Sequence, residues 1–243
     1  MSETGPQSRQ ILKMNIEKII DHTPQVRELI LKVEQPKKFQ FQAGQFVTLH
    51  VPGDPKPVLR AYSIASSDLQ TDGFRLLFKY IENGIASTFV WSLKGTETLN
   101  FTGPFGRVLF KTPPAQQIIM LSTGTGLSQH LSYLYSKKDL FPDLSYRLLF
   151  GIQSEKDIYY REELENLQSE MKNFKFDIVL SNPSPNWKGK SGYVQHFLKE
   201  FDIKNIDTHI YLCGNGRMIK DTKQLLIEGE NFDKSKIFSE AFD

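Results

Sequence analysis

Four consecutive residues, Arg60-Ala61-Tyr62-Ser63, combine a permanent cation, an aromatic ring and a hydroxyl group. In an extended strand, Arg60 and Tyr62 would point to one face and Ser63 to the other. Arginine can grip a diphosphate in a fork, a phenol ring can lie on a flat heterocycle, and a hydroxyl can reach a ring nitrogen. The set suits a flat ring linked to phosphates, while an edge strand with one exposed Arg and a half-buried Tyr is the alternative interpretation.

A second candidate site follows the predicted strand that ends at Tyr80-Ile81. Gly84-Ile85-Ala86-Ser87-Thr88 precedes a stretch with helical spacing. Free N–H groups at a helix start can bind an anion, and a glycine lets the anion approach. A plain N-cap by Ser87 is the alternative. Further along, Gly103-Pro104-Phe105-Gly106 predicts a turn.

Two further glycine-containing stretches lie in the second half of the chain. Gly124-Thr125-Gly126 stands between a predicted strand and a predicted helix, where a helix N-terminus attracts phosphate. The longer dinucleotide fingerprint is incomplete because its third spaced glycine is missing. Cys213-Gly214 ends another predicted strand, so we expect Cys213 near the same edge of the sheet, although a lone cysteine is more often a small buried hydrophobe.

The elements that carry these stretches predict two kinds of fold. The first half has short alternating strands, such as the run from Val47 to Val51, separated by turns, which indicates an antiparallel β-barrel or sandwich. Pro113-Pro114 cannot continue a strand ladder and marks a boundary. In the second half, continuous apolar strands alternate with helical segments, which predicts a parallel sheet with helices on both faces. We therefore expect a β domain over residues 1–112 and an α/β domain over residues 113–243. The predicted strands of the second half cover 118–121, 147–151, 176–180, 210–213 and 236–238, and the predicted helices cover 160–173, 192–201 and 218–229 after one that begins at Leu127.

Composition narrows the classes of function. The chain has 243 residues, 39% of them hydrophobic and 24% charged, and a formal net charge of +2. These values describe a soluble globular protein and do not indicate nucleic-acid binding. No apolar run has membrane length and the stretch from Met1 to Ser8 is polar, so we expect no membrane association and a cytoplasmic location. Cys213 is the only cysteine, which excludes a four-cysteine iron–sulfur cluster in this chain, and the five histidines lack metal-binding spacing, so no metal site is predicted.

In order and spacing, the motifs resemble those of the ferredoxin–NADP⁺ reductase superfamily. The resemblance runs from about Gln45 to the C-terminus. It implies a β-barrel FAD-binding domain followed by an α/β domain that binds a pyridine nucleotide. The matching motifs are Arg60-x-Tyr62-Ser63, Gly84-x-x-Ser87, Gly103-Pro104-x-Gly106, Gly124-Thr125-Gly126 and Cys213-Gly214-Asn215-x-x-Met218.

The resemblance also implies roles for individual residues on the FAD side. Arg60 would contact the pyrophosphate, Tyr62 would stack on the flavin ring, and Ser63 would hydrogen-bond near flavin N5. Phe242, near the C-terminus, would cover the outer face of the flavin. The remaining residues expected to bind FAD are Ala61, Gly84, Ile85, Ala86, Ser87 and Thr88.

For the nucleotide, the resemblance places the phosphates on Gly124-Thr125-Gly126 and the nicotinamide near Cys213 and Gly214. Glu240 would help in hydride or proton transfer, which makes Ser63, Cys213 and Glu240 the expected catalytic residues.

The chain departs from the family pattern in two places. After Gly126 it continues Leu127-Ser128-Gln129, where relatives often have a hydrophobic residue followed by Ala-Pro. It has Ser181-Asn182 where NADP⁺-preferring relatives often have Ser-Arg. Downstream, Lys188, Lys190 and Tyr193 could replace the missing arginine at a 2′-phosphate, or could belong to a solvated loop. We expect NADPH as donor, with NADH as the alternative.

The expected function is an FAD-dependent NAD(P)H oxidoreductase. Hydride would pass from the nucleotide to flavin N5 in a crevice between the domains, and electrons would then pass singly to a separate ferredoxin or flavodoxin. We expect a monomer. The alternatives are a reductase of free flavin or ferric chelates, the electron-transfer component of an oxygenase, and a non-catalytic nucleotide-binding regulatory subunit.

Overall fold

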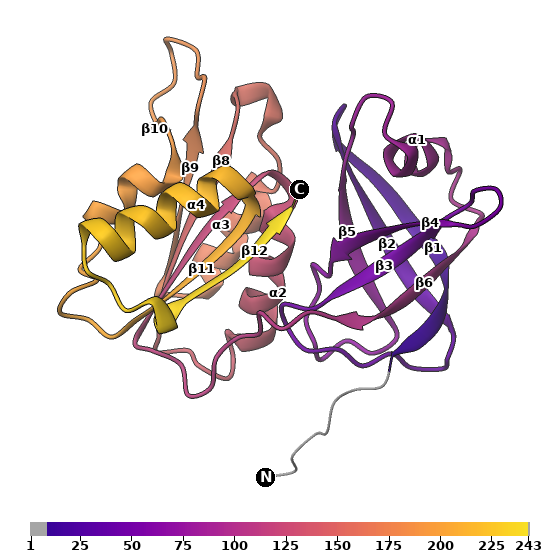
Figure 1. The fold of residues 1–243 in the computed structure, drawn as a ribbon, viewed down its shortest axis with the longest axis horizontal. Helices are drawn as coiled ribbons and strands as arrows, with labels where there is room; N and C mark the ends of the chain where they lie inside the picture. The colour runs from indigo at the N-terminus through magenta and orange to yellow at the C-terminus, as the bar shows by residue number, and fades with distance from the viewer. Residues whose placement is uncertain (1–8, 243) are drawn as a thin grey trace. The chain divides into compact units, whose positions relative to one another are not determined.

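The computed structural model describes residues 9–242 and divides the chain into two compact units. The first unit comprises residues 1–109 and 131–136, and the second comprises residues 110–130 and 137–243 (Figure 1). Residues 1–8, on which the cytoplasmic expectation partly rests, lie outside the described part of the chain. Between residues 9 and 242 no helix is long and apolar enough to cross a membrane.

One antiparallel sheet forms the frame of the first unit, with its strands in the order β4-β3-β6-β1-β2-β5. A bridge between Ile64 and Leu76 brings the chain beyond β4 next to β5, so the sheet curls into a half-barrel. The predicted antiparallel fold is therefore confirmed. The elements are β1 (Gln10–Thr23), β2 (Val26–Gln35), β3 (Phe46–Val51), β4 (Val58–Ser63), β5 (Gly73–Lys79), α1 (Ile85–Ser92) and β6 (Thr98–Phe105).

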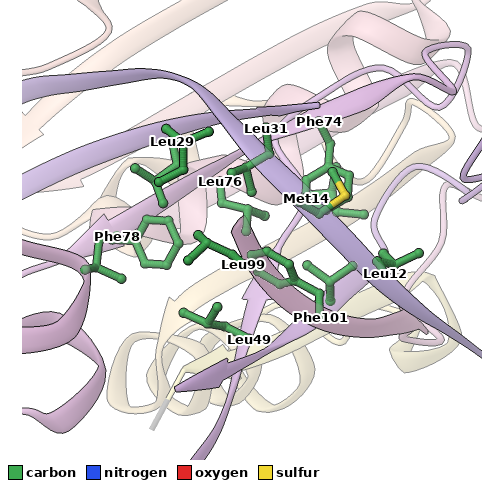
Figure 2. Close-up of a cluster of buried hydrophobic side chains, with 14 of the residues drawn as sticks. Leu12, Met14, Leu29, Leu31, Leu49, Phe74, Leu76, Phe78, Leu99 and Phe101 are labelled. Atoms are coloured by element: carbon green, nitrogen blue, oxygen red, sulfur yellow. The ribbon is translucent and has the colours of Figure 1, made fainter. Parts of the chain in front are cut away.

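Apolar side chains at every second position of the strands fill the interior of this half-barrel. Val47, Leu49 and Val51 of β3 are buried, and a polar or aromatic residue separates each pair. Figure 2 shows side chains from several strands meeting in one apolar cluster. The labelled members are Leu12, Met14, Leu29, Leu31, Leu49, Phe74, Leu76, Phe78, Leu99 and Phe101.

Two features of this unit differ from the expectation. Strand β1 was not predicted, although Leu12, Met14 and Ile16 are buried in alternation with exposed residues. The segment expected to be a turn at Gly103 is instead the end of β6, and only Gly106 has the positive φ of a turn residue, +109°. The sheet needs the bare Gly103, since a Cβ there would lie 2.8 Å from a methyl of Val47.

A parallel sheet with strand order β10-β9-β8-β7-β11-β12 forms the frame of the second unit, as predicted. In β7, Ile118 and Met120 alternate with Ile119 and Leu121, and all four are fully buried, so both faces of the sheet are covered. The strands are β7 (Gln117–Thr123), β8 (Ser145–Ile152), β9 (Phe174–Leu180), β10 (Lys190–Ser191), β11 (Thr208–Asn215) and β12 (Ile237–Phe242).

The helical segments of the second half of the chain follow the predicted order with changed bounds; residues 131–136 of α2 belong to the first unit. The helix predicted at 192–201 is a 3₁₀ helix, η3, and the one predicted at 218–229 begins earlier and ends in a π-helical turn, η4. The strand expected at 236–238 is the longer β12. The helical segments are η1 (Gly124–Gly126), α2 (Leu127–Lys137), η2 (Glu155–Asp157), α3 (Arg161–Glu170), η3 (Val194–Glu200), α4 (Gly216–Gln224), η4 (Leu225–Gly229) and η5 (Lys234–Lys236).

Candidate cofactor sites

Strand β4 carries the first candidate site and is the edge strand of the antiparallel sheet. Arg60 is exposed, and its guanidinium group donates only to the neighbouring carbonyl of Leu59, at 2.9 Å, among the bonds found in residues 9–242. Tyr62 is half-buried and packs on Phe78 of β5, with ring centroids 4.3 Å apart. Burial raises the pKa of the Tyr62 phenol to about 12 although Arg60 opposes this, so the ring is neutral at physiological pH.

Ser63 is the last residue of β4 and points to the opposite face. It is 5% exposed, and its Oγ has no hydrogen-bond partner within the described part of the chain. An unpaired buried hydroxyl costs about 1–3 kcal/mol, a penalty that a ligand accepting or donating there would remove. Residues 60–63 thus form the edge strand with an exposed Arg60 and a half-buried Tyr62 that the alternative interpretation describes. That interpretation does not explain why the buried Ser63 hydroxyl lacks a hydrogen-bond partner among the described residues.

Helix α1 begins at a bare glycine. Gly84 is the N-cap, in extended conformation, and no side chain caps the helix. The Ser87 hydroxyl instead donates to the carbonyls of Ile81 and Gly84, at 2.7 and 3.0 Å, so the alternative of an N-cap by Ser87 is wrong. The first backbone N–H groups of a helix lack intrahelical acceptors, and the first turn here contains no acidic residue that would repel an anion. The exposed side chains of Ile85 and Thr88 and the buried Ala86 leave the backbone as the binding element.

At the carboxyl end of the parallel sheet, two glycines lock the ends of β7 and β11 together. A Cβ on Gly126 would lie 2.6 Å from the carbonyl carbon of Cys213, and one on Gly214 would lie 2.6 Å from the carbonyl oxygen of Thr123. The Thr123 hydroxyl also accepts from the N–H of Asn215, at 2.9 Å. Gly126 and Gly214 therefore serve close packing of the protein with itself.

Gly124 differs from these two glycines. Its φ is +51°, and an added Cβ would meet nothing within 4 Å. It lies in η1, between β7 and α2, with the side chain of Thr125 next to it. Of the Gly-Thr-Gly motif, Gly124 is thus the residue that leaves open space at the start of a helix, where a phosphate would approach.

Beside these loops, Cys213 and Glu240 pair across β11 and β12. Cys213 is fully buried, and burial together with the neighbouring Glu240 raises its thiol pKa well above the ordinary value, so the thiol is protonated. Burial also raises the pKa of Glu240 to about 7, opposed by a hydrogen bond from Gln129 of α2. The Gln129 amide nitrogen lies 2.6 Å from Glu240 Oε2. The site therefore holds a neutral thiol next to a carboxyl group that titrates near neutral pH.

Gln129 was not expected to be a site residue. The sequence signal was a run of three polar residues, Ser128-Gln129-His130, between the apolar Leu127 and Leu131, and all three are buried. Ser122 was likewise missed: it ends the buried part of β7, pairs with Cys213, and its Oγ has no partner among the described residues. Phe242 lies opposite Asn215 at the end of β12 and is half-buried.

The loop after β9 holds the residues expected at a 2′-phosphate. Ser181 is exposed, and its N–H bonds to the carbonyl of Ile152. The Lys190 ammonium lies 2.5 Å from Glu200 and 3.9 Å from Asp177, so two carboxylates already balance its charge, which argues against phosphate binding by this residue. Lys188 is exposed, as is Tyr193 at 60%. Of these two lysines, Lys188 is therefore the better candidate to bind a 2′-phosphate.

Two family models match the chain, one for each half. The oxidoreductase FAD-binding domain matches residues 13–110, and the oxidoreductase NAD-binding domain matches residues 120–224. Among curated proteins, ferredoxin–NADP reductase B of Sorangium cellulosum is 32% identical over 229 residues, which cover 91% of this chain and 93% of that protein. The chain belongs to the ferredoxin–NADP⁺ reductase superfamily. It is an oxidoreductase with FAD and NAD(P) as its cofactors.

The chain is also similar to reductases with other names. The glycine betaine monooxygenase reductase subunit of Pseudomonas aeruginosa is 31% identical over 229 residues, covering 93% of this chain but 62% of that protein. The cytochrome P450 reductase GcoB of Amycolatopsis superimposes with a TM-score of 0.88 at 21% identity, covering all of this chain and 73% of that one. A ferredoxin NADP⁺ reductase from Neisseria gonorrhoeae with bound FAD and NADP gives 0.80 at 23% identity, covering 97% and 99%. The structural matches establish the ferredoxin–NADP⁺ reductase fold.

The residues of this ferredoxin–NADP⁺ reductase superfamily member fit both cofactors. On the antiparallel unit, the orphaned Ser63 hydroxyl and the uncapped start of α1 are what a flavin nucleotide needs. On the parallel unit, Gly124 offers open space and Ser122 offers a second orphaned hydroxyl. No group of three or more His, Cys, Asp or Glu residues in the described chain is arranged to hold a metal ion.

Proposed function

We propose that this chain oxidises NAD(P)H and passes the electrons one at a time to a separate carrier protein. When bound, FAD supplies this chemistry, because it takes up a hydride and releases single electrons. The observation that carries the proposal is Ser63, a buried hydroxyl with no hydrogen-bond partner among residues 9–242, at the end of a strand that also presents Arg60 and Tyr62. The similarity to ferredoxin–NADP reductase B supports the same function.

On the antiparallel unit, the proposal gives each residue of β4 a task. Arg60 binds the pyrophosphate, Tyr62 stacks on the flavin ring, and Ser63 hydrogen-bonds near flavin N5. The segment from Gly84 to Thr88 holds the pyrophosphate through the N–H groups of Ile85–Ser87, because those of Gly84 and Thr88 already donate to the carbonyls of Ile81 and Gly84. Tyr62 is suited to stacking because packing against Phe78 already fixes its ring, so little conformational entropy is lost on binding.

On the parallel unit, the nucleotide phosphates bind at Gly124 and the start of α2, with Gly126 and Gly214 shaping the loops. Cys213 lies against the nicotinamide as a neutral, apolar contact, since its thiol is protonated. Glu240 accepts or supplies a proton near neutral pH, and Phe242 covers the flavin. Lys188 with Ser181 and Tyr193 binds the 2′-phosphate of NADPH, and NADH is the alternative donor.

The acceptor we propose is a ferredoxin or a flavodoxin. An oxygenase component is the second candidate, because the glycine betaine monooxygenase reductase subunit and the reductase component DmpP of phenol 2-monooxygenase are 31% and 29% identical to this chain. The chain spans 62% and 63% of those two proteins. Reduction of free flavin or ferric chelates and a purely regulatory role remain the other hypotheses.

One set of assays tests the proposal. The purified chain, loaded with FAD, is mixed with NADPH or NADH and with ferredoxin, flavodoxin, free FMN or a ferric chelate, and electron transfer is followed by absorbance. We expect fast reduction of a one-electron protein carrier. Protein that is colourless after incubation with FAD and removal of the unbound FAD would refute the flavoenzyme assignment, and turnover confined to free flavin or ferric chelates would refute electron transfer to a carrier protein. The domain limits 1–112 and 113–243, the monomeric state and the cytoplasmic location stay predictions from the sequence.

A further inference from the structure

The contact between Gln129 and Glu240 joins two elements that are far apart in the sequence. Gln129 lies in α2 and Glu240 lies in β12, and the amide nitrogen donates to Glu240 Oε2 over 2.6 Å. Gln129 is fully buried and Glu240 is partly buried, so the bond forms in a region of low dielectric constant. A hydrogen bond to a charged group in such surroundings is stronger than one in water.

We propose that Gln129 is the positioning residue for Glu240, fixing its carboxyl group beside Cys213 and binding it in both its ionised and its protonated form. This inference rests on the proton-transfer role of Glu240 proposed above. An amide can do this because it has both an N–H donor and a carbonyl acceptor. The N–H donates to the carboxylate, and after rotation of the amide the carbonyl accepts from the protonated acid.

The surroundings of Glu240 leave few other groups to control its proton. From β11, Cys213 contributes a thiol that burial keeps protonated, with its pKa well above the ordinary value. From α2, the neighbour of Gln129 is His130, whose imidazole is neutral because burial lowers its pKa to about 3. From α4, Arg217 is 89% exposed and lies 3.7 Å from Asp221. Gln129 is therefore the group through which the protein can set the pKa of Glu240.

The same residue explains one departure from the family pattern. At the third position after Gly126 this chain has Gln129 where relatives often have proline. A proline would have neither an N–H nor a side-chain amide to give to Glu240. Gln129 thus provides a side-chain donor in the first turn of α2 that a proline at this position would lack.

The test follows the Glu240 carboxyl group directly, by ¹³C NMR titration of the FAD-loaded protein labelled at glutamate. The signal is assigned by its loss in Glu240→Gln. We expect a midpoint near pH 7 in the native protein. The Gln129 amide binds the ionised carboxylate through a charge-assisted bond, more strongly than it binds the protonated acid. Gln129→Met has similar length but no amide and should therefore raise that pKa by about one unit, and Gln129→Glu should raise it further through like-charge repulsion. Gln195→Met, which replaces another buried glutamine in η3, is the matched control and should leave the Glu240 titration unchanged.

A kinetic readout separates positioning from a structural role. In stopped flow, the midpoint of the pH profile for flavin reduction should move with the NMR midpoint in Gln129→Met, while the KM for the nucleotide changes less than about twofold. In a Glu240→Gln background, Gln129→Met should have no further effect on the profile. If Gln129→Met folds poorly, Gln129→Leu replaces it, because leucine also lacks the amide donor and adds no charge.

The two proposals fail separately. An unchanged Glu240 midpoint in the Gln129 variants overturns the positioning role. Unchanged flavin reduction in Glu240→Gln overturns the catalytic role of Glu240 proposed above, and the NMR midpoint still decides whether Gln129 controls the carboxyl group.

Discussion

Gly124 offers a decisive test of the nucleotide site, because it combines a left-handed backbone with open space. Its φ of +51° favours glycine, yet an added Cβ would touch nothing within 4 Å. Gly124→Ala should therefore fold. The new methyl group would enter the space that we assign to a nucleotide phosphate, and should hold the phosphate away from the N–H groups at the start of α2.

The two effects of Gly124→Ala can be estimated separately. The left-handed conformation costs an alanine about 1–2 kcal/mol, which lowers the melting temperature by about 2–8 °C in a chain of this size. Loss of one charge-assisted hydrogen bond to a phosphate costs about 1.5–3 kcal/mol, which is at least about tenfold in affinity. Since this contact is made in the ground state and the transition state alike, KM should rise while kcat changes little.

The measurements are thermal unfolding, NADP⁺ titration of the oxidised protein and steady-state kinetics. Gly95→Ala is the matched control, because Gly95 also has a positive φ, +93°, with Ile19 Cδ1 at 4.0 Å as the nearest atom to a Cβ. It should lose similar stability and keep its nucleotide affinity. If Gly124→Ala binds NADP⁺ as tightly as the Gly95→Ala protein does, the phosphate does not lie at Gly124 and the site has been misplaced.

Three further outcomes are expected. Tyr62→Ala should weaken FAD binding by about 1 kcal/mol or more, whereas Tyr62→Phe keeps the ring on Phe78 and should keep FAD affinity within about twofold. Equal FAD affinity of the two variants in fluorescence titrations would show that Tyr62 does not contact the flavin. Lys188→Ala should raise the KM for NADPH about fivefold and leave the KM for NADH unchanged, with Lys199→Ala, another exposed lysine, as the control. Parallel changes in KM for both nucleotides would mean that Lys188 does not bind the 2′-phosphate. The pKa of Glu240 is raised to about 7 from an ordinary 4.5, so the folded state binds this proton more tightly, and the resulting stabilisation is complete below pH 4.5 and is lost as pH rises through 7. Between pH 4.5 and 8, the free energy of unfolding of the native protein should fall by up to about 2–3 kcal/mol more than that of Glu240→Gln in denaturant titrations. Identical pH dependence of the two proteins would show that the carboxyl group is not buried as described.

Much of the fold could be predicted from residue periodicity. Period-two alternation in the first half and continuous apolar strands in the second are direct consequences of one-sided and two-sided burial, and both sheets form as expected. Strand β1 was not predicted because the exposed Ile11 and the partly buried Ile19 and Ile20 interrupt the alternation of apolar and polar residues. At the end of β6 the sequence predicts a turn because glycine and proline favour turns locally, whereas in the structure Gly103 is required by a close approach to Val47.

The candidate site could be predicted only where a motif is local. The residues Arg60, Tyr62 and Ser63 lie within one strand, so their alternation follows from sequence. The bond between Gln129 and Glu240 spans 111 positions and depends on how α2 and β12 are placed, which no local pattern contains. Lys190 shows the reverse case, since its type suits a phosphate but its partners Glu200 and Asp177 become neighbours only in the folded chain.

The reciprocal fit of Gly126 and Gly214 limits how this protein can be engineered. Each glycine makes room for the backbone of the other loop, so the segments Gly124–Gly126 and Cys213–Asn215 pack as one unit. A chimera that exchanges one loop for that of a relative with a different backbone path would clash at the other. Grafts that aim to change nucleotide preference should therefore exchange both loops together, or should leave both in place and alter the segment after β9.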